Sequence, residues 1–296
     1  EELTKAACCD LAGCFETQLS VESKTTNIIT NTKELSVLGL SGVYNHILIN
    51  GMPIVNGSNY TYGVSGIPGT LIKEIFISQG LASVLQGPES ITGQINILLK
   101  EHQKSEKWFL NLYTNSFLNK QMNIDYNFTA GRWKSIISFH TQQPSNKIDE
   151  NNDNFLDLPQ STKYAFYNNW TNGLVDNEGL YTSLSLRYLK EKRVGGQIDF
   201  NESTDQGSYL KYGQIIQFSQ PEAILKTSYN FKNGNALESQ TAISTHNQNS
   251  FFGSTEYSAN QLNYYTKLSH KLRWKTHQIR TGIDFKYLKL NEEVKL

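Results

Sequence analysis

Long segments of the chain after residue 100 alternate apolar and polar residues with a period of two. In residues 179–189, Leu180, Leu184 and Leu186 lie on one face, whereas Ser185 and Arg187 lie on the other. This alternation predicts half-buried β-strands. Segments of the same kind lie near 108–117, 123–130, 133–141, 163–170, 211–219, 223–231, 236–245, 261–272 and 278–287.

The connections between these segments differ in length. NKQ (119–121) and NGN (233–235) are typical of tight turns, whereas 142–162, 191–210 and 246–260 are long and polar. Short turns on one side and long loops on the other are typical of outer-membrane barrels, whose strands need about 9–11 residues. A large soluble β-sandwich would alternate in the same way, so the period alone leaves both architectures open.

The first hundred residues follow a different pattern, in which short apolar runs are separated by many glycines. The run from Tyr44 to Ile49 ends in Asn50-Gly51, which is a strong β-hairpin signal. Residues 70–78 and 94–100 predict two more strands, and the N-terminal residues predict a short helix. We therefore expect a small α+β domain at 1–100 and a separate antiparallel β-structure at 101–296.

The composition favours a polar, aromatic, strand-rich protein. Of 296 residues, 38% are hydrophobic and 11% aromatic, and the mean hydropathy is −0.47. The 27 basic and 27 acidic residues give a formal net charge of zero, which argues against a nucleic-acid partner. No run approaches the ~18–20 apolar residues of a membrane helix, so any membrane span must be a barrel. Trp108, Trp133, Trp170 and Trp274 near strand ends favour an aromatic girdle.

The glycine pattern of residues 68–100 resembles the plug domain of TonB-dependent outer-membrane receptors. A strand (72–78) and Gly80 are followed by Ser-Val-Leu-Gln-Gly (83–87) and then by Gly-Gln-Ile-Asn-Ile (93–97). LINGMP (48–53) matches the strand and turn of this family, with asparagine in place of the usual aspartate. LGL (38–40) stands where the family usually has Arg-Gly, so that arginine is absent. We expect Gly87 and Gly93 to occupy positions where a Cβ is excluded or φ is positive, so that valine at either should reduce assembly more than valine at Gly253, which is expected in a long loop.

The resemblance implies a plug followed by a transmembrane β-barrel of about 22 strands. At roughly 20 residues per strand and loop, residues 101–296 would supply only about nine or ten of them. The chain begins with Glu1 and ends within a strand-like pattern, so we expect an N-terminally truncated plug and an incomplete barrel. Residues 5–17, 151–159 and 247–253 also resemble the receptors of Bacteroidetes.

By resemblance, the protein is an outer-membrane receptor rather than an enzyme. Such receptors bind a scarce nutrient, typically a siderophore, haem or copper, and import it with energy from the TonB-ExbB-ExbD complex. They contact outer-membrane lipid and need no cofactor. The six scattered histidines and the absence of HExxH, GxSxG and P-loop motifs point to no catalytic site. The alternatives are an oligosaccharide importer, an adhesin-like barrel without active transport, and a soluble secreted β-domain.

Substrate in this family rests on apical plug loops, and the matching loop here follows Asn50-Gly51. Its candidate substrate-binding residues are Asn56, Asn59, Tyr60 and Tyr62. Tyrosine offers a rigid apolar face with one hydroxyl, and asparagine can donate and accept, so the set suits a polar chelate or a sugar. The alternative is that both tyrosines pack the plug against the barrel wall.

Two other groups could hold a metal ion. Asp149, Asn151, Asp153 and Asp157 follow the 1, 3, 5, 9 spacing of a calcium loop, although Asn154 replaces the turn glycine and Gln160 the final glutamate. A solvated loop is the alternative to a structural Ca²⁺ site. Cys8, Cys9 and Cys14 could form a local disulfide or a thiolate metal site, and the sequence leaves this open.

Overall fold

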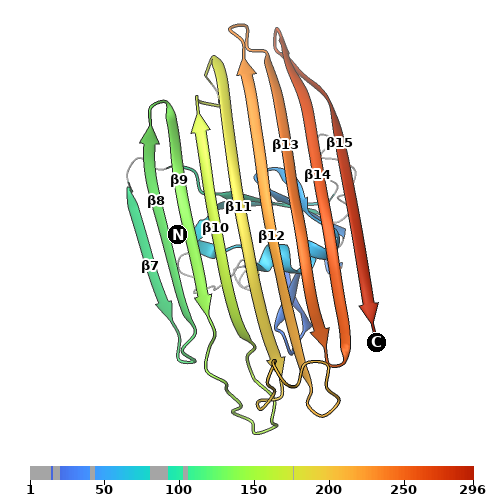
Figure 1. Cartoon of the computed structure of the whole chain (residues 1–296). Helices are drawn as coiled ribbons and strands as arrows, with labels where there is room; N and C mark the ends of the chain where they lie inside the picture. The colour runs from blue at the N-terminus through green and yellow to red at the C-terminus, as the bar shows by residue number, and fades with distance from the viewer. Residues whose placement is uncertain (1–14, 16–20, 41–43, 81–92, 103–105, 176) are drawn as a thin grey trace.

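The computed structural model describes residues 15, 21–40, 44–80, 93–102, 106–175 and 177–296, which form a small N-terminal domain and a large sheet (Figure 1). The predicted N-terminal helix, the three cysteines and the segment 83–87 lie outside the described residues. Among the described residues, no helix has the length and apolar character needed to cross a membrane.

The N-terminal domain is built on two sheets. Its elements are β1 (Glu22–Asn27), β2 (Thr32–Ser36), β3 (Asn45–Ile49), β4 (Met52–Val55), η2 (Gly57–Asn59), α3 (Tyr60–Ser65), η3 (Gly69–Leu71), β5 (Ile72–Gln79) and β6 (Gly93–Leu99). β1 and β2 form a hairpin, and the other strands form a sheet of order β4-β3-β6-β5. Within that sheet β3 and β6 are parallel, and the other two pairs are antiparallel.

The predicted hairpin at Asn50-Gly51 is confirmed. Both residues have positive φ, 50° and 76°, as a type I′ turn requires. The Asn50 side chain also serves the sheet, because its Oδ1 accepts a hydrogen bond from the Leu99 amide at 2.9 Å. This turn therefore ties the β3–β4 hairpin to the end of β6.

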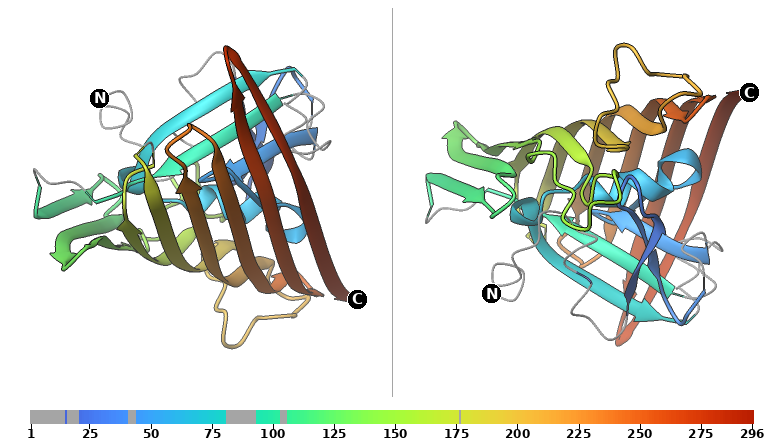
Figure 2. Two further views of the ribbon diagram at one scale, coloured as in Figure 1. Left: turned by 90° about the horizontal axis from the view of Figure 1, so that it is seen from above. Right: turned by 90° about the horizontal axis from the view of Figure 1, so that it is seen from below.

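The large sheet contains nine antiparallel strands, each paired with the next along the chain. They are β7 (Trp108–Thr114), β8 (Lys120–Ala130), β9 (Trp133–Gln143), β10 (Gln160–Asn172), β11 (Gly179–Gly196), β12 (Gly213–Asn230), β13 (Ala236–Phe252), β14 (Thr255–Trp274) and β15 (His277–Lys295). The number of strands agrees with the nine or ten expected. The sheet curves around the N-terminal domain, which lies on its concave side (Figure 2). We call the concave side the inner face and the convex side the outer face.

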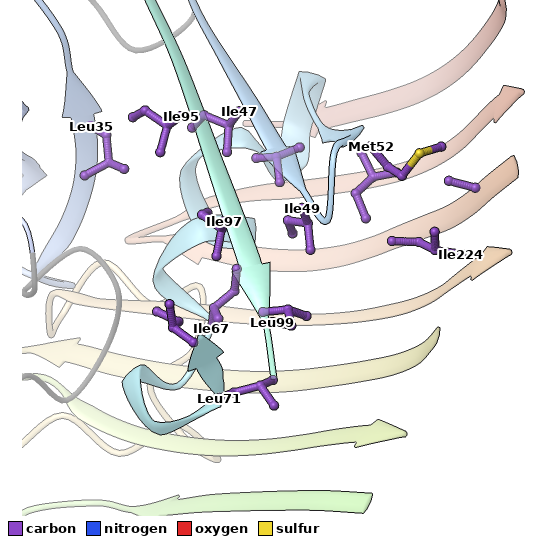
Figure 3. Close-up of a cluster of buried hydrophobic side chains, with 14 of the residues drawn as sticks. Leu35, Ile47, Ile49, Met52, Ile67, Leu71, Ile95, Ile97, Leu99 and Ile224 are labelled. Atoms are coloured by element: carbon purple, nitrogen blue, oxygen red, sulfur yellow. The ribbon is translucent and has the colours of Figure 1, made fainter. Parts of the chain in front are cut away.

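The two units share one apolar core (Figure 3). Ile47, Ile95 and Ile97 of the small sheet are at most 1% exposed, and Ile224 of β12 packs against the same cluster. At about 25 cal/mol per Å² of apolar surface, this burial stabilises the contact as well as the domain. The N-terminal domain is therefore packed against the large sheet rather than tethered beside it.

Strand connections differ at the two edges of the large sheet. The lower edge in Figure 1, here the loop edge, carries 115–119, 144–159, 197–212 and 253–254. The upper edge, here the turn edge, carries 131–132, 173–178, 231–235 and 275–276. The two longest connections lie at the loop edge. This asymmetry is the one that outer-membrane barrels show.

Three connections differ from the prediction. The loop expected at 191–210 starts later, because β11 continues to Gly196. The loop expected at 246–260 is wrong, because β13 and β14 occupy most of it and only 253–254 connect them. The tight turn expected at 119–121 lies at 115–119, on the loop edge.

The outer face carries an apolar band with aromatic borders. All four tryptophans lie near the turn edge, where Phe128 packs edge-on against Trp170 with ring centroids 5.3 Å apart. On β14 the band extends from Trp274 to Tyr264, ten residues away, which spans ~25 Å at the usual rise and tilt. Beyond it the outer face becomes polar, as at Lys190 and Lys289. This is the profile of a lipid-facing surface.

Gly93→Ala is expected to lower the free energy of unfolding of the full-length protein in detergent by about 2 kcal/mol. A Cβ at Gly93 would lie 2.7 Å from the Ser78 carbonyl oxygen, and that backbone belongs to the β5–β6 ladder. Gly63→Ala is the matched control, because its Cβ would make ordinary contacts at 3.6 Å. Equal unfolding free energies of the two variants would contradict this reading.

The expected position of Gly253 in a long loop is wrong. Gly253 lies in a two-residue turn with φ +62°, and a Cβ there would lie 3.0 Å from the Tyr212 ring. A side chain at this position is therefore strained. Gly87 lies outside the described residues.

Candidate functional site at the contact between the two units

The N-terminal domain contacts the inner face of the large sheet through polar side chains as well as through the apolar core. Two contacts lie toward the turn edge or the middle of the sheet. The Lys226 ammonium donates to the Asn50 carbonyl, and Lys100 forms an ion pair with Asp125 at 2.9 Å. Ser138 donates to the other oxygen of Asp125 at 2.5 Å. The carboxylate is thus compensated although it is almost completely buried.

Gln261 of β14 holds the turn that precedes α3. Its Oε1 accepts from the Ser58 amide at 2.8 Å and from the Ser58 hydroxyl at 2.9 Å. Its Nε2 lies 3.0 Å from both the carbonyl and the side-chain oxygen of Asn56. Gly57 lies between them with φ +57°, and a Cβ there would be only 2.3 Å from Gln261 Oε1. The Gln261 side chain of the large sheet therefore holds both Asn56 and Ser58, at the two ends of a turn that requires glycine at position 57.

The structure brings the four predicted substrate-binding residues together in this same segment. Asn59 is fully buried, with Nδ2 donating to the Ile54 carbonyl at 2.9 Å and Oδ1 accepting from the Asn56 amide at 2.7 Å. Tyr60 donates to the Leu35 carbonyl at 3.3 Å, and the Tyr62 ring lies 5.2 Å from that of Phe218. Burial raises the pKa of both tyrosines. The tyrosines pack within the domain and against the sheet, and the substrate role of the four residues stays a prediction.

The β1–β2 hairpin contacts the sheet near the loop edge. Arg193 donates to the Asn31 carbonyl at 3.2 Å and to Glu191 at 2.5 Å. Lys163 lies 3.8 Å from the second oxygen of Glu191, so one buried carboxylate sits between two buried cations. A Cβ at Gly195 would lie 2.2 Å from the Ile29 carbonyl, so glycine permits this approach. The hairpin tip is anchored by its backbone, and the Ile28 side chain is 86% exposed.

A second buried charge pair lies on the inner face of β11 and β12. Arg187 binds Glu222 through two bonds of 2.6 Å, and Gln220 donates to the same carboxylate at 2.5 Å. Gln220 Oε1 in turn lies 3.2 Å from His246 Nδ1. A chain of polar groups thus crosses three strands beneath α3.

The predicted calcium loop is an exposed loop whose carboxylates bond to its own backbone. Asp149 accepts from the amides of Asp153 and Asn154, and Asp157 accepts from the Glu150 amide at 2.7 Å. Among the described residues, no three His, Cys, Asp or Glu side chains converge on a metal-sized space. Calcium binding by Asp149, Asn151, Asp153 and Asp157 stays a prediction.

Comparison with known proteins places this geometry in a class. Residues 12–94 match the family model of the TonB-dependent receptor plug domain. No curated protein matches the chain in sequence. The chain therefore carries a plug domain of the kind that TonB-dependent receptors place inside their barrels, and we use this name for the N-terminal domain from here on.

Solved structures share the fold of the whole chain. A copper transporter, OprC, superposes with a TM-score of 0.77 at 13% identity, over 97% of this chain and 44% of that one. The siderophore receptor PiuA from Acinetobacter baumannii gives 0.74 at 13%, over 97% and 44%. The ferripyoverdine receptor of the Pseudomonas aeruginosa outer membrane gives 0.76 at 13%, over 96% and 41%.

These likenesses establish the fold. The large sheet has the fold of part of the barrel in these structures, beside a domain that matches the plug model, and the chain spans less than half the length of the structures it matches. The assignment to the receptors of Bacteroidetes stays a prediction.

Proposed function

We propose that the full-length protein is an outer-membrane receptor that binds a scarce nutrient, a siderophore or other metal chelate, and imports it with energy from TonB-ExbB-ExbD. The observation that carries the proposal is a plug domain packed inside a curved wall whose outer face has an apolar band. A soluble domain would gain nothing from such a band, because an exposed apolar surface of this size is an aggregation site. The names of the similar structures, which include copper and siderophore proteins, support a metal chelate.

The orientation in the membrane follows from the two edges of the sheet. In outer-membrane barrels long loops face the outside and short turns the periplasm. The loop edge then faces the medium, and the anchored β1–β2 hairpin and the segment 56–62 lie on the side from which substrate would arrive. Asn59, Tyr60 and Tyr62 are buried in this arrangement and Asn56 is half-buried, so the buried three would contact substrate only after the segment leaves Gln261 and Phe218.

Uptake by whole cells tests the proposal. We expect cells with the full-length protein in the outer membrane to accumulate radiolabelled iron or copper from a panel of ferric chelates, haem and copper salts. Cells that lack the gene should not do so, and a protonophore should abolish the difference. Recovery of the protein as a soluble periplasmic monomer would contradict the proposal. So would uptake that is unchanged by loss of the gene across the whole panel.

The chelate concentration that half-saturates binding to the same cells tests the substrate residues. Tyr60→Phe/Tyr62→Phe keeps the packing and removes both hydroxyls, and it should weaken chelate binding roughly tenfold, the equivalent of ~1.4 kcal/mol. Tyr229→Phe, on the outer face, is the control. Unchanged affinity in a protein that assembles normally would remove support for Tyr60 and Tyr62 as substrate contacts.

A further inference from the structure

A cavity of about 650 Å³ lies on the inner face at the turn edge, next to Glu101, which follows the last strand of the plug. Its walls come from β11, β12, β13, β14 and β15 and from the connections 173–178 and 231–235. These connections lie at the top of Figure 1. The volume is in the range of small-molecule binding sites.

Basic residues outnumber acidic residues in the lining of this cavity. The basic residues are Lys226, Lys232, Lys271, Arg273 and Arg280, and the acidic residues are Glu101, Glu178 and Glu238.

Each acidic residue already has a cation beside it. Lys232 pairs with Glu178 at 3.8 Å and Arg280 with Glu238 at 3.2 Å, while Glu101 pairs with Lys73 at 3.5 Å. Among the described residues, Lys271 and Arg273 form no ion pair. Lys271 and Arg273 thus contribute two positive charges that no anion balances, and Lys226, which donates to the Asn50 carbonyl, forms no ion pair in the described part of the chain either.

The register of β14 and β15 concentrates these charges. Lys271 lies directly opposite Arg280 across the two strands, and Arg273 follows two residues later on the same face. Like charges that face each other across a sheet are destabilising. An anion in the cavity would relieve this repulsion between Lys271 and Arg280. Without a bound anion, the facing charges only destabilise the sheet, and this favours a binding role for them.

A second, smaller cavity has lining residues in common with this site and others from the contact between plug and sheet. It has a volume of about 60 Å³ and shares Glu101, Tyr181 and Lys226 with the larger cavity. Tyr167 and Asn169 are among its lining residues, and the Tyr167 hydroxyl and Asn169 Oδ1 are buried without a hydrogen-bond partner among the described residues. Such a space suits water or a small polar group. Polar groups thus lie between the Asn50 turn and the basic cavity.

We propose that the basic cavity binds small polyanions through carboxylate or phosphate groups and receives the substrate after it has passed the plug. This assignment rests on the proposed import function and narrows its substrate to an anionic chelate. Lys271 and Arg273 supply the unpaired positive charges, and Arg280 adds a planar donor that matches a carboxylate.

Calorimetric titration of the purified full-length protein tests the site. The probes are citrate and pyrophosphate at low salt, with uncharged xylitol as the control ligand. We expect Lys271→Gln/Arg273→Gln to weaken binding of both anions at least tenfold. Lys275→Gln/Lys289→Gln removes the same net charge from exposed positions outside the cavity and should leave binding unchanged. Glu238→Gln frees Arg280 and should tighten binding several-fold.

The outcomes separate this proposal from the import function. If neither anion binds, or if both double variants bind alike, the cavity is not an anion site, whatever the uptake assay shows. If citrate binding depends on Lys271 and Arg273 in a protein that supports no uptake, the import function fails and the anion site stands. Tighter binding of xylitol than of citrate would also overturn the proposal.

Discussion

Arg187→Ala is expected to lower the free energy of unfolding of the full-length protein by about 3–5 kcal/mol. The substitution leaves the Glu222 carboxylate on the inner face of the sheet without the guanidinium that binds it through two bonds of 2.6 Å. Both side chains are at most 5% exposed, so water cannot replace the lost partner. The measurement is equilibrium unfolding by denaturant in a detergent or lipid that supports refolding.

An exposed ion pair gives the matched control for Arg187→Ala. Lys192 on β11 pairs with Glu202 in the connection 197–212, and these side chains are 38% and 45% exposed. Lys192→Ala should cost less than about 1 kcal/mol, as is usual for surface pairs. Equal losses in the two variants would show that burial does not govern the contribution of the Arg187–Glu222 pair.

The outer face was predictable because a sheet with one apolar and one polar face imposes a strict period of two on its strands. Leu180 and Leu186 were expected on one face of their strand, and they are 54% and 39% exposed on the outer face. The prediction of a long loop at 246–260 was wrong because this segment lacks the alternation by which strands were recognised. Beyond the apolar band both faces of β13 and β14 are polar, so the strands continue without any alternation that the sequence could reveal.

Pro221 made one strand look like two. The alternation suggested segments at 211–219 and 223–231, which lie on either side of Pro221, a residue that has no donor for the ladder. In the structure β12 runs unbroken from Gly213 to Asn230 and pairs with β11 throughout. The pairing of β12 with β13 is interrupted at Gln220 and Pro221 and resumes in the same register at Glu222. Pairing with a strand on each side therefore keeps β12 extended at Pro221, although proline donates no hydrogen bond there.

The site was predictable only where it is local. The Asn50-Gly51 turn is specified by two adjacent residues, and it formed as expected. The sequence did not predict the plug contacts of Gln261, Arg193 and Lys226, because their partners lie 205, 162 and 176 residues away along the chain. Their only signal was polar character on one strand face, which a water-filled lumen would explain equally well. The contact itself had to be seen in three dimensions.

Glu191→Ala is expected to destabilise the protein and to release the β1–β2 hairpin from the sheet. Glu191 is 1% exposed and lies within ion-pair distance of both Lys163 and Arg193, so its removal brings two buried cations together without their shared anion. Arg193 would then have to turn toward water, and its bonds to the Thr30 and Asn31 carbonyls would be lost. The loss in unfolding free energy should be about 3–5 kcal/mol.

Amide hydrogen exchange of the full-length protein distinguishes this local effect from general destabilisation. In Glu191→Ala, backbone amides of residues 27–32 should exchange much faster at a denaturant-free condition in which the strands of the large sheet remain protected. Arg187→Ala serves as the comparison, because Arg187 bonds to Glu222 within the sheet and should leave the hairpin protected despite a similar loss of stability. Glu191→Gln keeps an acceptor for Arg193 and should fall between the two. Equal protection of residues 27–32 in all three variants would show that the hairpin is held by its other contacts, such as the Asn27–Gln214 bond of 2.8 Å, and not by the Glu191 cluster.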